Sequence, residues 1–197
     1  MDTNDIINVL KENGRVVAIR TDTVYGLVCN ANDIVAVEKI YQIKNRERKK
    51  PLALFIKNSD EIEKYVDHKC LTSKLQNLLK KYWPGALTVI LNKKNEKYDY
   101  LLNGQSKIGI RVPNDDTLLA ILDNIDFPLV ETSCNISGEK EYENADIIKE
   151  KIGDKVDLIV DGGVIKENTP STVIEIDDGI INILRVGAIK IDVKNIN

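Results

Sequence analysis

The sequence predicts an α/β protein built on a mixed sheet. Short apolar runs of strand length alternate with helical patterns over most of the chain, and the last third turns to strand-like runs. Of the 197 residues, 43% are hydrophobic and 30% are charged, which suffices for one core and excludes global disorder. The sequence contains no internal repeat and no Gly-, Ser- or Pro-rich linker, so residues 1–197 are expected to form a single domain.

The expected helices combine apolar residues at helical spacing with residues that suit helix ends. Asp33 and Thr72 can each cap the first turn of a helix, and either Asp115 or Asp116 can open another. Ser59 can cap a further helical segment. The helices are expected at residues 4–13, 34–43, 60–66, 73–83, 116–122 and 145–152.

The expected strands are short apolar runs, most of them rich in β-branched residues. The turn signal at residues 177–179, Asp-Asp-Gly, separates two of these runs and predicts a hairpin. Residues 133–138 are expected to form a polar loop. The strands are expected at residues 16–19, 52–56, 86–91, 108–112, 128–132, 156–160, 171–176, 180–186 and 189–193.

Composition argues against several classes of protein. The formal charge of -3 and the pI of about 5.4 do not suit a general nucleic-acid or membrane-surface binder. No run approaches the roughly 18 apolar residues of a membrane span, and the acidic, polar N-terminus lacks the pattern of a secretory signal. The three cysteines fit neither a disulfide framework nor a zinc site. The cytoplasm is therefore the expected location, with no membrane partner.

The familiar nucleotide-binding and hydrolase motifs are missing from the sequence. Residues 104–109 have the glycine spacing of a Walker A loop, but Ile110-Arg111 stands where Lys-Ser/Thr is required, and there is no G-x-G-x-x-G. The single histidine, His68, excludes an HExxH zinc site and is expected at the surface. Cys134 is expected to be a small buried thiol and not a nucleophile.

Polar and cationic clusters follow, or lie within, the apolar strands. In α/β folds ligands gather at the carboxyl ends of strands, and a set of cations, hydroxyls and an amide indicates a site for a polyphosphate or a carboxylate. Each cluster taken alone fits a turn or a solvated loop about equally well. The clusters are Thr21-Asp22-Thr23, Lys44 to Lys50, Arg111, Ser133-Cys134-Asn135, Pro170-Ser171-Thr172 and Arg185-Val186-Gly187.

Together these clusters resemble, in order and spacing, the motifs of the YrdC-like (TsaC-like) threonylcarbamoyl-AMP synthases. Residues 21–27, Thr-Asp-Thr-Val-Tyr-Gly-Leu, are similar to that family's P-T-[DE]-T-V-Y-G-L, and residues 132–138 to its [TP]-S-A-N-x-S-G. The remaining matches are K-x-R at 44–46, [NK]-P-L at 50–52, W-P-G-x-[LV]-T at 83–88, V-R-x-P at 110–113, P/E-S-T-[VI] at 170–173 and R-x-G at 185–187. Arg20, Glu47, Phe55 and Glu141 depart from the family's pattern.

The resemblance covers nearly the whole chain and implies the short, single-domain form of that family. It implies a YrdC-like twisted, open mixed sheet with helices packed around it and a deep basic cavity. The implied reaction joins L-threonine, bicarbonate or CO2, and ATP into L-threonylcarbamoyl-AMP and pyrophosphate, which makes the enzyme a nucleotidyltransferase. This reaction is the first step of the t6A modification of tRNA.

The resemblance also implies roles for individual residues. Lys44 and Arg46 would be the catalytic residues, and they lie in a basic loop before Pro51, where we expect no structural burial. ATP would be bound by Lys44, Arg46, Lys50, Ser133, Asn135 and Arg185. Threonine would be bound by Thr23, Arg111, Thr132 and Ser171. Mg2+ would be carried by the ATP phosphates, with no dedicated metal site.

The implied partners are a downstream threonylcarbamoyl transferase complex and, less directly, tRNA. Two other functions remain open on the sequence. One is an RNA-binding or ribosome-associated module, against which the charge and the 5% content of aromatic residues weigh. The other is a carbamoyl-adenylate-handling domain of the hydrogenase-maturation type.

Overall fold

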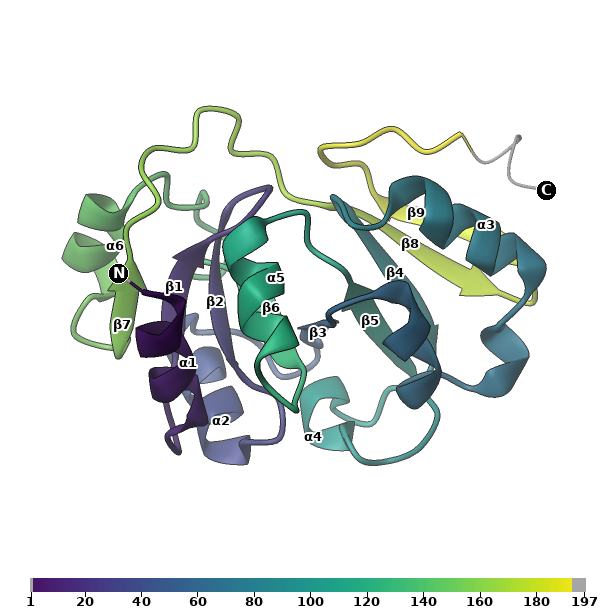
Figure 1. The fold of residues 1–197 in the computed structure, drawn as a ribbon, viewed down its shortest axis with the longest axis horizontal. Coiled ribbons are helices and arrows are strands. Elements are labelled where there is room, and N and C mark those ends of the chain that lie inside the picture. The colour runs from purple at the N-terminus through teal and green to yellow at the C-terminus, as the bar shows by residue number, and fades with distance from the viewer. Residues whose placement is uncertain (1, 193–197) are drawn as a thin grey trace.

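The computed structural model describes residues 2–192, and within them nine strands form one mixed sheet (Figure 1). The strand order is β7-β1-β2-β6-β3-β5-β4-β8-β9, in which β1–β7, β3–β5 and β4–β8 are parallel pairs and the other pairs are antiparallel. The predicted α/β class with a mixed sheet is confirmed. The strands are β1 (Val17–Arg20), β2 (Tyr25–Asn30), β3 (Ala53–Phe55), β4 (Leu87–Asn92), β5 (Lys107–Arg111), β6 (Leu129–Ser133), β7 (Leu158–Val160), β8 (Thr172–Asp177) and β9 (Ile180–Arg185).

Three helices begin at the caps that the sequence indicates. Asp33 accepts hydrogen bonds from the first-turn amides of its helix, as do Thr72 and Asp115. The segment after Ser59 differs from the expectation, because it is a 3₁₀ helix and Asn58 caps it in place of Ser59. Within the described residues the helices are α1 (Thr3–Lys11), α2 (Ile34–Ile43), α3 (Ser73–Tyr82), α4 (Asp99–Leu102), α5 (Asp116–Asp123) and α6 (Ala145–Ile152), with 3₁₀ helices at Ser59–Lys64 and His68–Cys70.

Other elements also differ from the sequence-based expectation. Strand β2 was not expected, because it is buried on both faces between β1 and β6 and so shows no alternation of polar and apolar residues. The one-turn helix α4 was not expected either, because four residues show no helical period. The strand expected at 189–193 is wrong for residues 189–192, where the hydroxyl of Thr172 donates to the backbone oxygen of Ile189 and no strand is formed, and residue 193 lies outside the described residues.

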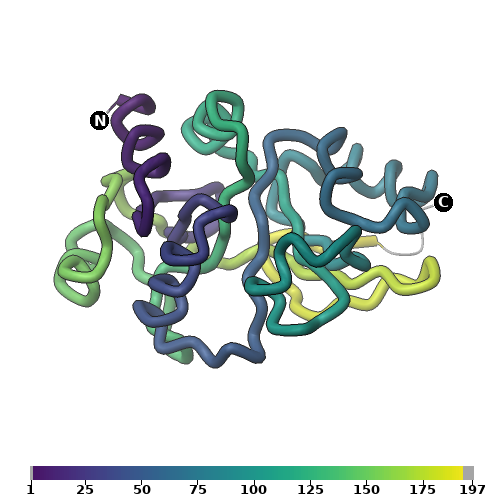
Figure 2. Tube along the Cα trace, turned by 90° about the horizontal axis from the view of Figure 1, so that it is seen from below, coloured from purple at the N-terminus to yellow at the C-terminus, as the bar shows by residue number. Residues whose placement is uncertain are grey.

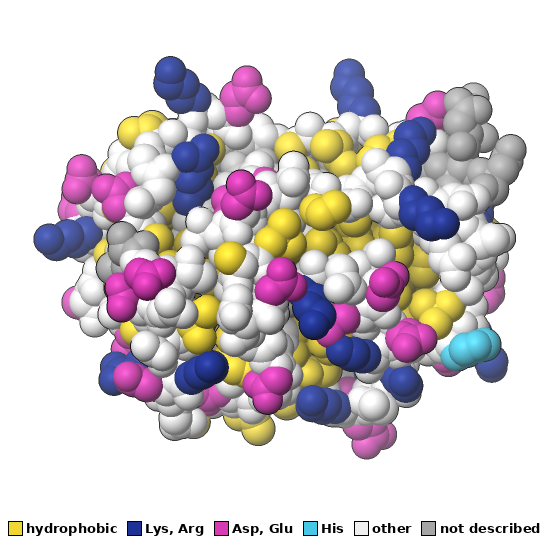
Figure 3. Space-filling model, in the orientation of Figure 1, with side chains coloured by type: hydrophobic (Ala, Val, Ile, Leu, Met, Phe, Trp, Pro, Cys, Tyr) yellow, Lys and Arg dark blue, Asp and Glu magenta, His cyan; other side chains and the backbone are white. Residues whose placement is uncertain are grey.

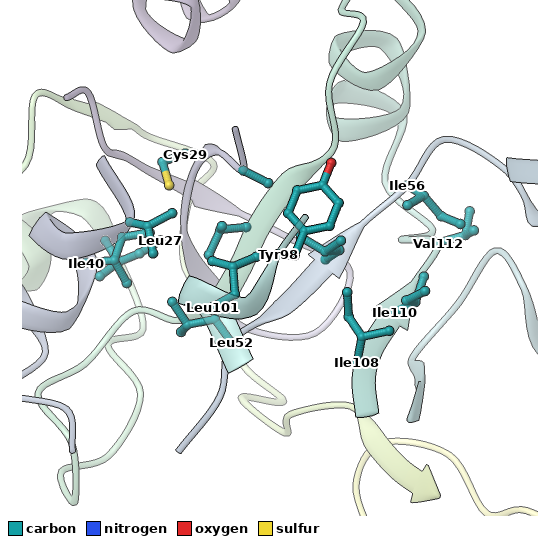
Figure 4. Packing of buried hydrophobic residues seen from close by; sticks show 14 of the residues in the cluster. Leu27, Cys29, Ile40, Leu52, Ile56, Tyr98, Leu101, Ile108, Ile110 and Val112 are labelled. Atoms are coloured by element: carbon teal, nitrogen blue, oxygen red, sulfur yellow. The ribbon is translucent and has the colours of Figure 1, made fainter. Parts of the chain in front are cut away.

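The hydrophobic core has two parts, one on each face of the sheet, because side chains alternate along every strand. The larger part packs helices α2, α3 and α6 against the sheet. Figure 4 shows a portion of it, in which Leu27 of β2 lies near Ile40 of α2, and Leu52 lies beside Leu101 of α4.

Helices α1 and α5 pack against each other and cover the opposite face at β1, β2 and β6 (Figure 1). The C-terminal β8–β9 hairpin lies far from α1 and α6, toward the other end of the molecule (Figure 2). The same face of the sheet continues over β3, β5, β4 and β8, where α1 and α5 do not cover it.

In residues 2–192 no helix is long and apolar enough to span a bilayer.

Candidate active site

A cavity of about 740 Å³ lies over the part of the sheet that α1 and α5 leave open. Its floor is hollow because Ala53 of β3, whose side chain is a single methyl group, lies opposite Gly109 of β5, which has no side chain. A Cβ atom added at Gly109 would lie only 3.3 Å from the Cβ of Ala53. The small residues therefore make the space that a ligand would need. The predicted site residues that line the cavity are Thr23, Arg46, Thr132, Ser133, Ser171 and Arg185.

A wider cavity of about 1160 Å³ lies on the other side of Thr23, beside the segment at 159–169. Of the predicted site residues it includes Thr23 alone. We therefore place the candidate active site in the smaller cavity, where side chains from five separate motifs of the sequence meet.

Lys44 follows the last residue of α2 and is buried, with 1% of its surface exposed. Its ammonium donates to the backbone oxygens of Ser133 and Asn135 and to Oδ1 of Asn135, the last two at 2.9 and 2.7 Å. Burial, with Arg46 nearby, lowers the pKa of Lys44 to about 8. The expectation of no structural burial in this loop is thus wrong for Lys44, which holds the 133–135 segment in place.

Arg46 is the part of the basic loop that reaches the cavity. Its guanidinium donates to the backbone oxygens of Lys50 and Pro51, both at 2.9 Å, and burial lowers its pKa. Lys50 is half exposed and pairs with Glu47 at 3.4 Å, outside the residues that line the cavity. Glu47 also pairs with Lys49, so its charge lies on the surface. The structure brings Arg46 to the site and leaves Lys50 out.

The segment from Ser133 to Asn135 is fixed by hydrogen bonds of its own. The hydroxyl of Ser133 donates to Oδ1 of Asn135 at 2.8 Å, and the amide of Asn135 donates to the backbone oxygen of Glu139 at 2.7 Å. Ser133 lines the cavity, whereas Asn135 lies behind it and is buried. Between them, burial raises the pKa of the Cys134 thiol to about 12, so it stays protonated and is a poor nucleophile.

Arg111 is fully buried, and protein groups already occupy its guanidinium. It donates to Oδ1 of Asp22 at 2.6 Å, to Oγ1 of Thr23 at 3.1 Å and to the backbone oxygen of Gly85 at 3.0 Å. The ring of Phe55 lies 5.5 Å from the guanidinium carbon. Arg111 therefore stands behind Thr23 in this structure and does not line the cavity.

Ser171 and Arg185 form the far wall of the cavity. Arg185 donates to the hydroxyl and to the backbone oxygen of Ser171, at 3.1 and 3.0 Å, and the same hydroxyl lies 2.9 Å from Oγ1 of Thr88. Gly187 allows this crossing of two segments, because a Cβ there would lie 2.2 Å from the backbone oxygen of Pro170. Close packing of the backbone thus explains why the R-x-G motif has a glycine at this position.

Sequence reasoning missed three charged residues that line the cavity, namely Lys107, Glu131 and Glu175. The signal for Glu131 was a carboxylate placed inside an otherwise uncharged strand, two residues before Ser133. With Arg46 and Arg185, the described lining holds three cations and two carboxylates. The strongly basic character expected of the cavity therefore remains a prediction.

The described part of the chain holds no group of three or more His, Cys, Asp or Glu side chains that could bind a metal ion. The cavity lies over one face of the sheet and offers hydroxyl groups, two guanidinium groups and an ammonium, together with two carboxylates. This is an arrangement that suits binding of an anionic substrate.

Comparison with known proteins identifies the family to which this fold and cavity belong. The family model Sua5_yciO_yrdC, described as "Telomere recombination", matches residues 9–187. The chain belongs to the Sua5/YciO/YrdC family.

Individual relatives agree with this assignment. "Putative threonylcarbamoyl-AMP synthase" of Methanocaldococcus jannaschii is 40% identical over 179 residues, which cover 91% of this chain and 83% of the relative. The structure of Pyrococcus abyssi Sua5 complexed with L-threonine has a TM-score of 0.87 at 30% identity and covers 94% of this chain. This chain spans 54% of that Pyrococcus chain. A nucleotide-bound structure of full-length HypF has a TM-score of 0.83 at 26% identity, over 94% of this chain and 29% of HypF.

Proposed function

We propose that this chain is an L-threonylcarbamoyl-AMP synthase that uses L-threonine, bicarbonate or CO2, and ATP and releases pyrophosphate. The observation that carries the proposal is the cavity itself, where Thr23, Ser133, Ser171 and both Arg46 and Arg185 meet. The relatives support it, since the Methanocaldococcus protein is named "Putative threonylcarbamoyl-AMP synthase" and the Pyrococcus protein "Threonylcarbamoyl-AMP synthase", and one related structure holds L-threonine.

The proposed reaction needs no protein nucleophile. The amine of threonine is first carboxylated to a carbamate, and a carbamate oxygen then attacks the α-phosphorus of ATP while pyrophosphate leaves. The enzyme would therefore act by positioning the reactants and neutralising charge. Such a mechanism agrees with a protonated Cys134 and with a single, exposed histidine, His68.

At the nucleotide end we propose that Arg46, Arg185 and Ser133 contact ATP directly. Each charge-assisted hydrogen bond to a phosphate would contribute about 1.5–3 kcal/mol. Lys44 and Asn135 would serve the same site by fixing the loop that carries Ser133. A direct role for Lys50 requires its exposed ammonium to leave Glu47 and turn toward the phosphates.

At the amino-acid end we propose that Thr23, Thr132 and Ser171 face threonine. The hydroxyl of Thr23 accepts a hydrogen bond from Arg111 and lies 3.1 Å from the hydroxyl of Thr21, and these two contacts fix its position. Arg111 would serve the amino-acid site through Thr23, because Asp22, Thr23 and the backbone oxygen of Gly85 already accept hydrogen bonds from its buried guanidinium.

We propose that Mg2+ enters with the ATP phosphates, because the described residues provide no cluster of acidic ligands for a dedicated site. The product would pass to a separate transferase complex that modifies tRNA, and the cytoplasm is the proposed location.

The charges on the face of the molecule in Figure 3 bear on whether the chain contacts tRNA directly. On that face acidic and basic side chains are interspersed, in contrast to the basic surface typical of an RNA-binding module.

The experiment is an assay of pyrophosphate release by the purified chain. Release is expected to require ATP, L-threonine and bicarbonate together, and mass spectrometry should identify threonylcarbamoyl-AMP. Pyrophosphate release that does not require threonine but requires carbamoyl phosphate would favour the hydrogenase-maturation chemistry. The similarity to HypF is the reason to include this test. No release under either condition, with RNA retained on a filter, would favour the binding module.

A further inference from the structure

Glu131 is placed in the floor of the cavity by the register of five strands. Its pairing partner in β3 is Ala53, which pairs with Gly109 of β5, and Gly109 pairs with Ile90 of β4. The same row reaches Glu175 of β8. Paired residues of neighbouring strands point to the same face of a sheet, so the two carboxylates stand on either side of the hollow at Ala53 and Gly109.

The two carboxylates differ in their bonding. Glu175 lies 3.2 Å from the ammonium of Lys107, which also pairs with Asp177 at 3.1 Å. Glu131 lies 3.8 Å from a nitrogen of Arg111, which is beyond hydrogen-bonding distance. Among residues 2–192 no group donates a hydrogen bond to the carboxylate of Glu131, although only 15% of its side chain is exposed.

The charge of Arg111 is already matched by another residue. Asp22 accepts from Arg111 at 2.6 Å, so this buried guanidinium faces two carboxylates, of which Asp22 holds the short contact. Arg46, the guanidinium that lines this cavity, donates to the backbone oxygens of Lys50 and Pro51. Glu131 therefore gives this end of the cavity a carboxylate without a hydrogen-bonded cation.

We propose that Glu131 binds the ammonium group of the amino-acid substrate. The proposal rests on the proposed function and adds a residue to its amino-acid site. Glu131 is a partly buried carboxylate that accepts no hydrogen bond from the described residues. An ammonium is a compact cation with three N–H donors, so it can supply both the hydrogen bonds and the opposite charge. Thr23 lines the same cavity and places a hydroxyl group near the same ligand.

Mg2+ is the other cation to weigh at this position. It requires octahedral coordination by oxygen atoms, and Glu131 is a single carboxylate beside a guanidinium at 3.8 Å. The described residues form no group of three or more His, Cys, Asp or Glu side chains that would complete a metal site there. The geometry thus favours a monovalent hydrogen-bonding cation over a divalent metal ion.

The test compares two ligands that differ only in this group: L-threonine, and 2,3-dihydroxybutanoate of the same configuration, which carries a hydroxyl in place of the ammonium. Calorimetric titration should show that the wild type prefers threonine. In Glu131→Gln the affinity for threonine should fall at least tenfold, while that for 2,3-dihydroxybutanoate changes less than threefold. Glu131→Asp, which keeps the charge, should recover part of the preference, and the KM for ATP should stay within threefold of wild type.

Glu175→Gln is the matched control, because it neutralises the other carboxylate of the same row and should keep the preference for threonine. An equal loss of both ligands in Glu131→Gln would indicate a structural role, and a raised KM for ATP or a raised requirement for Mg2+ would indicate a role at the phosphates. Each of these results would overturn the proposal. If the wild type binds threonine and Glu131→Gln retains the full preference, this proposal alone fails. If the wild type binds no threonine, the proposed function fails with it.

Discussion

The ammonium of Lys44 donates to both oxygens of Asn135, the backbone oxygen at 2.9 Å and the side-chain Oδ1 at 2.7 Å. This contact joins the end of α2 to the segment after β6, two regions that are 91 residues apart in sequence. Lys44 was expected to contact phosphate, but in the structure it fixes the loop that carries Ser133, which lies at the proposed phosphate site. A buried ammonium with three oxygen acceptors should also make stability depend on pH.

Between about pH 8 and 10.5, the difference in stability between wild type and Lys44→Met should grow in favour of wild type. The folded state lowers the pKa of Lys44 to about 8 from its ordinary 10.5, so in this window the unfolded chain binds the proton and the folded chain does not. Raising the pH therefore favours folding, by at most about 1.4 kcal/mol per pH unit. Urea denaturation of both proteins from pH 6 to 10 measures this difference. Below pH 8 it should be flat, and a flat line throughout would contradict the lowered pKa.

Arg46→Ala should lower kcat/KM for ATP by about 10- to 150-fold, which corresponds to the loss of one charge-assisted contact of about 1.5–3 kcal/mol. Arg48→Ala is the matched control from the same loop. Arg48 pairs with Glu38 and stacks on Tyr41 away from the cavity, so its loss should leave kcat/KM within threefold of wild type. Equal effects of the two substitutions would show that the overall charge of the loop matters and not the position of Arg46.

Asp22→Asn should destabilise the fold by about 3–5 kcal/mol, because it leaves the buried guanidinium of Arg111 without its short-range carboxylate. Chemical denaturation at neutral pH measures the loss. The control is Glu12→Gln, which removes an exposed partner of Arg15 and should cost less than about 1 kcal/mol. A loss below about 1 kcal/mol for Asp22→Asn would mean that Glu131, at 3.8 Å, takes over as the counter-charge.

The cavity should prefer threonine over serine modestly and reject valine strongly. The hydroxyl groups of Thr23 and Ser171 are held by Arg111 and Arg185, so a substrate without a hydroxyl would leave oriented polar groups unpaired. Such rejection reaches roughly 10⁴-fold, whereas the methyl group that serine lacks is worth about 10–200-fold. Pyrophosphate release at fixed bicarbonate gives kcat/KM for the three amino acids. Valine turning over as well as serine would show that the substrate hydroxyl is not recognised.

Much of the fold followed from local signals. Asp33, Thr72 and Asp115 cap helices as expected, because a cap depends on a side chain and amides two or three residues away. Strand β2 was missed for the opposite reason. Its neighbours β1 and β6 bury both of its faces, and such burial removes the alternation on which strand prediction depends.

The predicted site residues fall into three groups: those that line the cavity, those that are buried behind it, and one that lies at the surface. The motifs identified which residues gather, and six of them do line one cavity. The same motifs did not show that Lys44 and Arg111 would be buried, because both look like surface cations when sequence is the only guide. Lys50, from the same motif set, remains at the surface beside Glu47.

By itself, then, the sequence determined the α/β class, the helix ends and the family resemblance, all of which depend on residue type and short spacing. Only the tertiary structure decided what each charge does. The register of β6, β3 and β5 placed Glu131 in a floor made hollow by Ala53 and Gly109, and the approach of Asp22 to Arg111 occupied the guanidinium expected to meet the substrate. Coulomb energies depend on distance and burial, and both are set by strands and loops that are far apart in the chain.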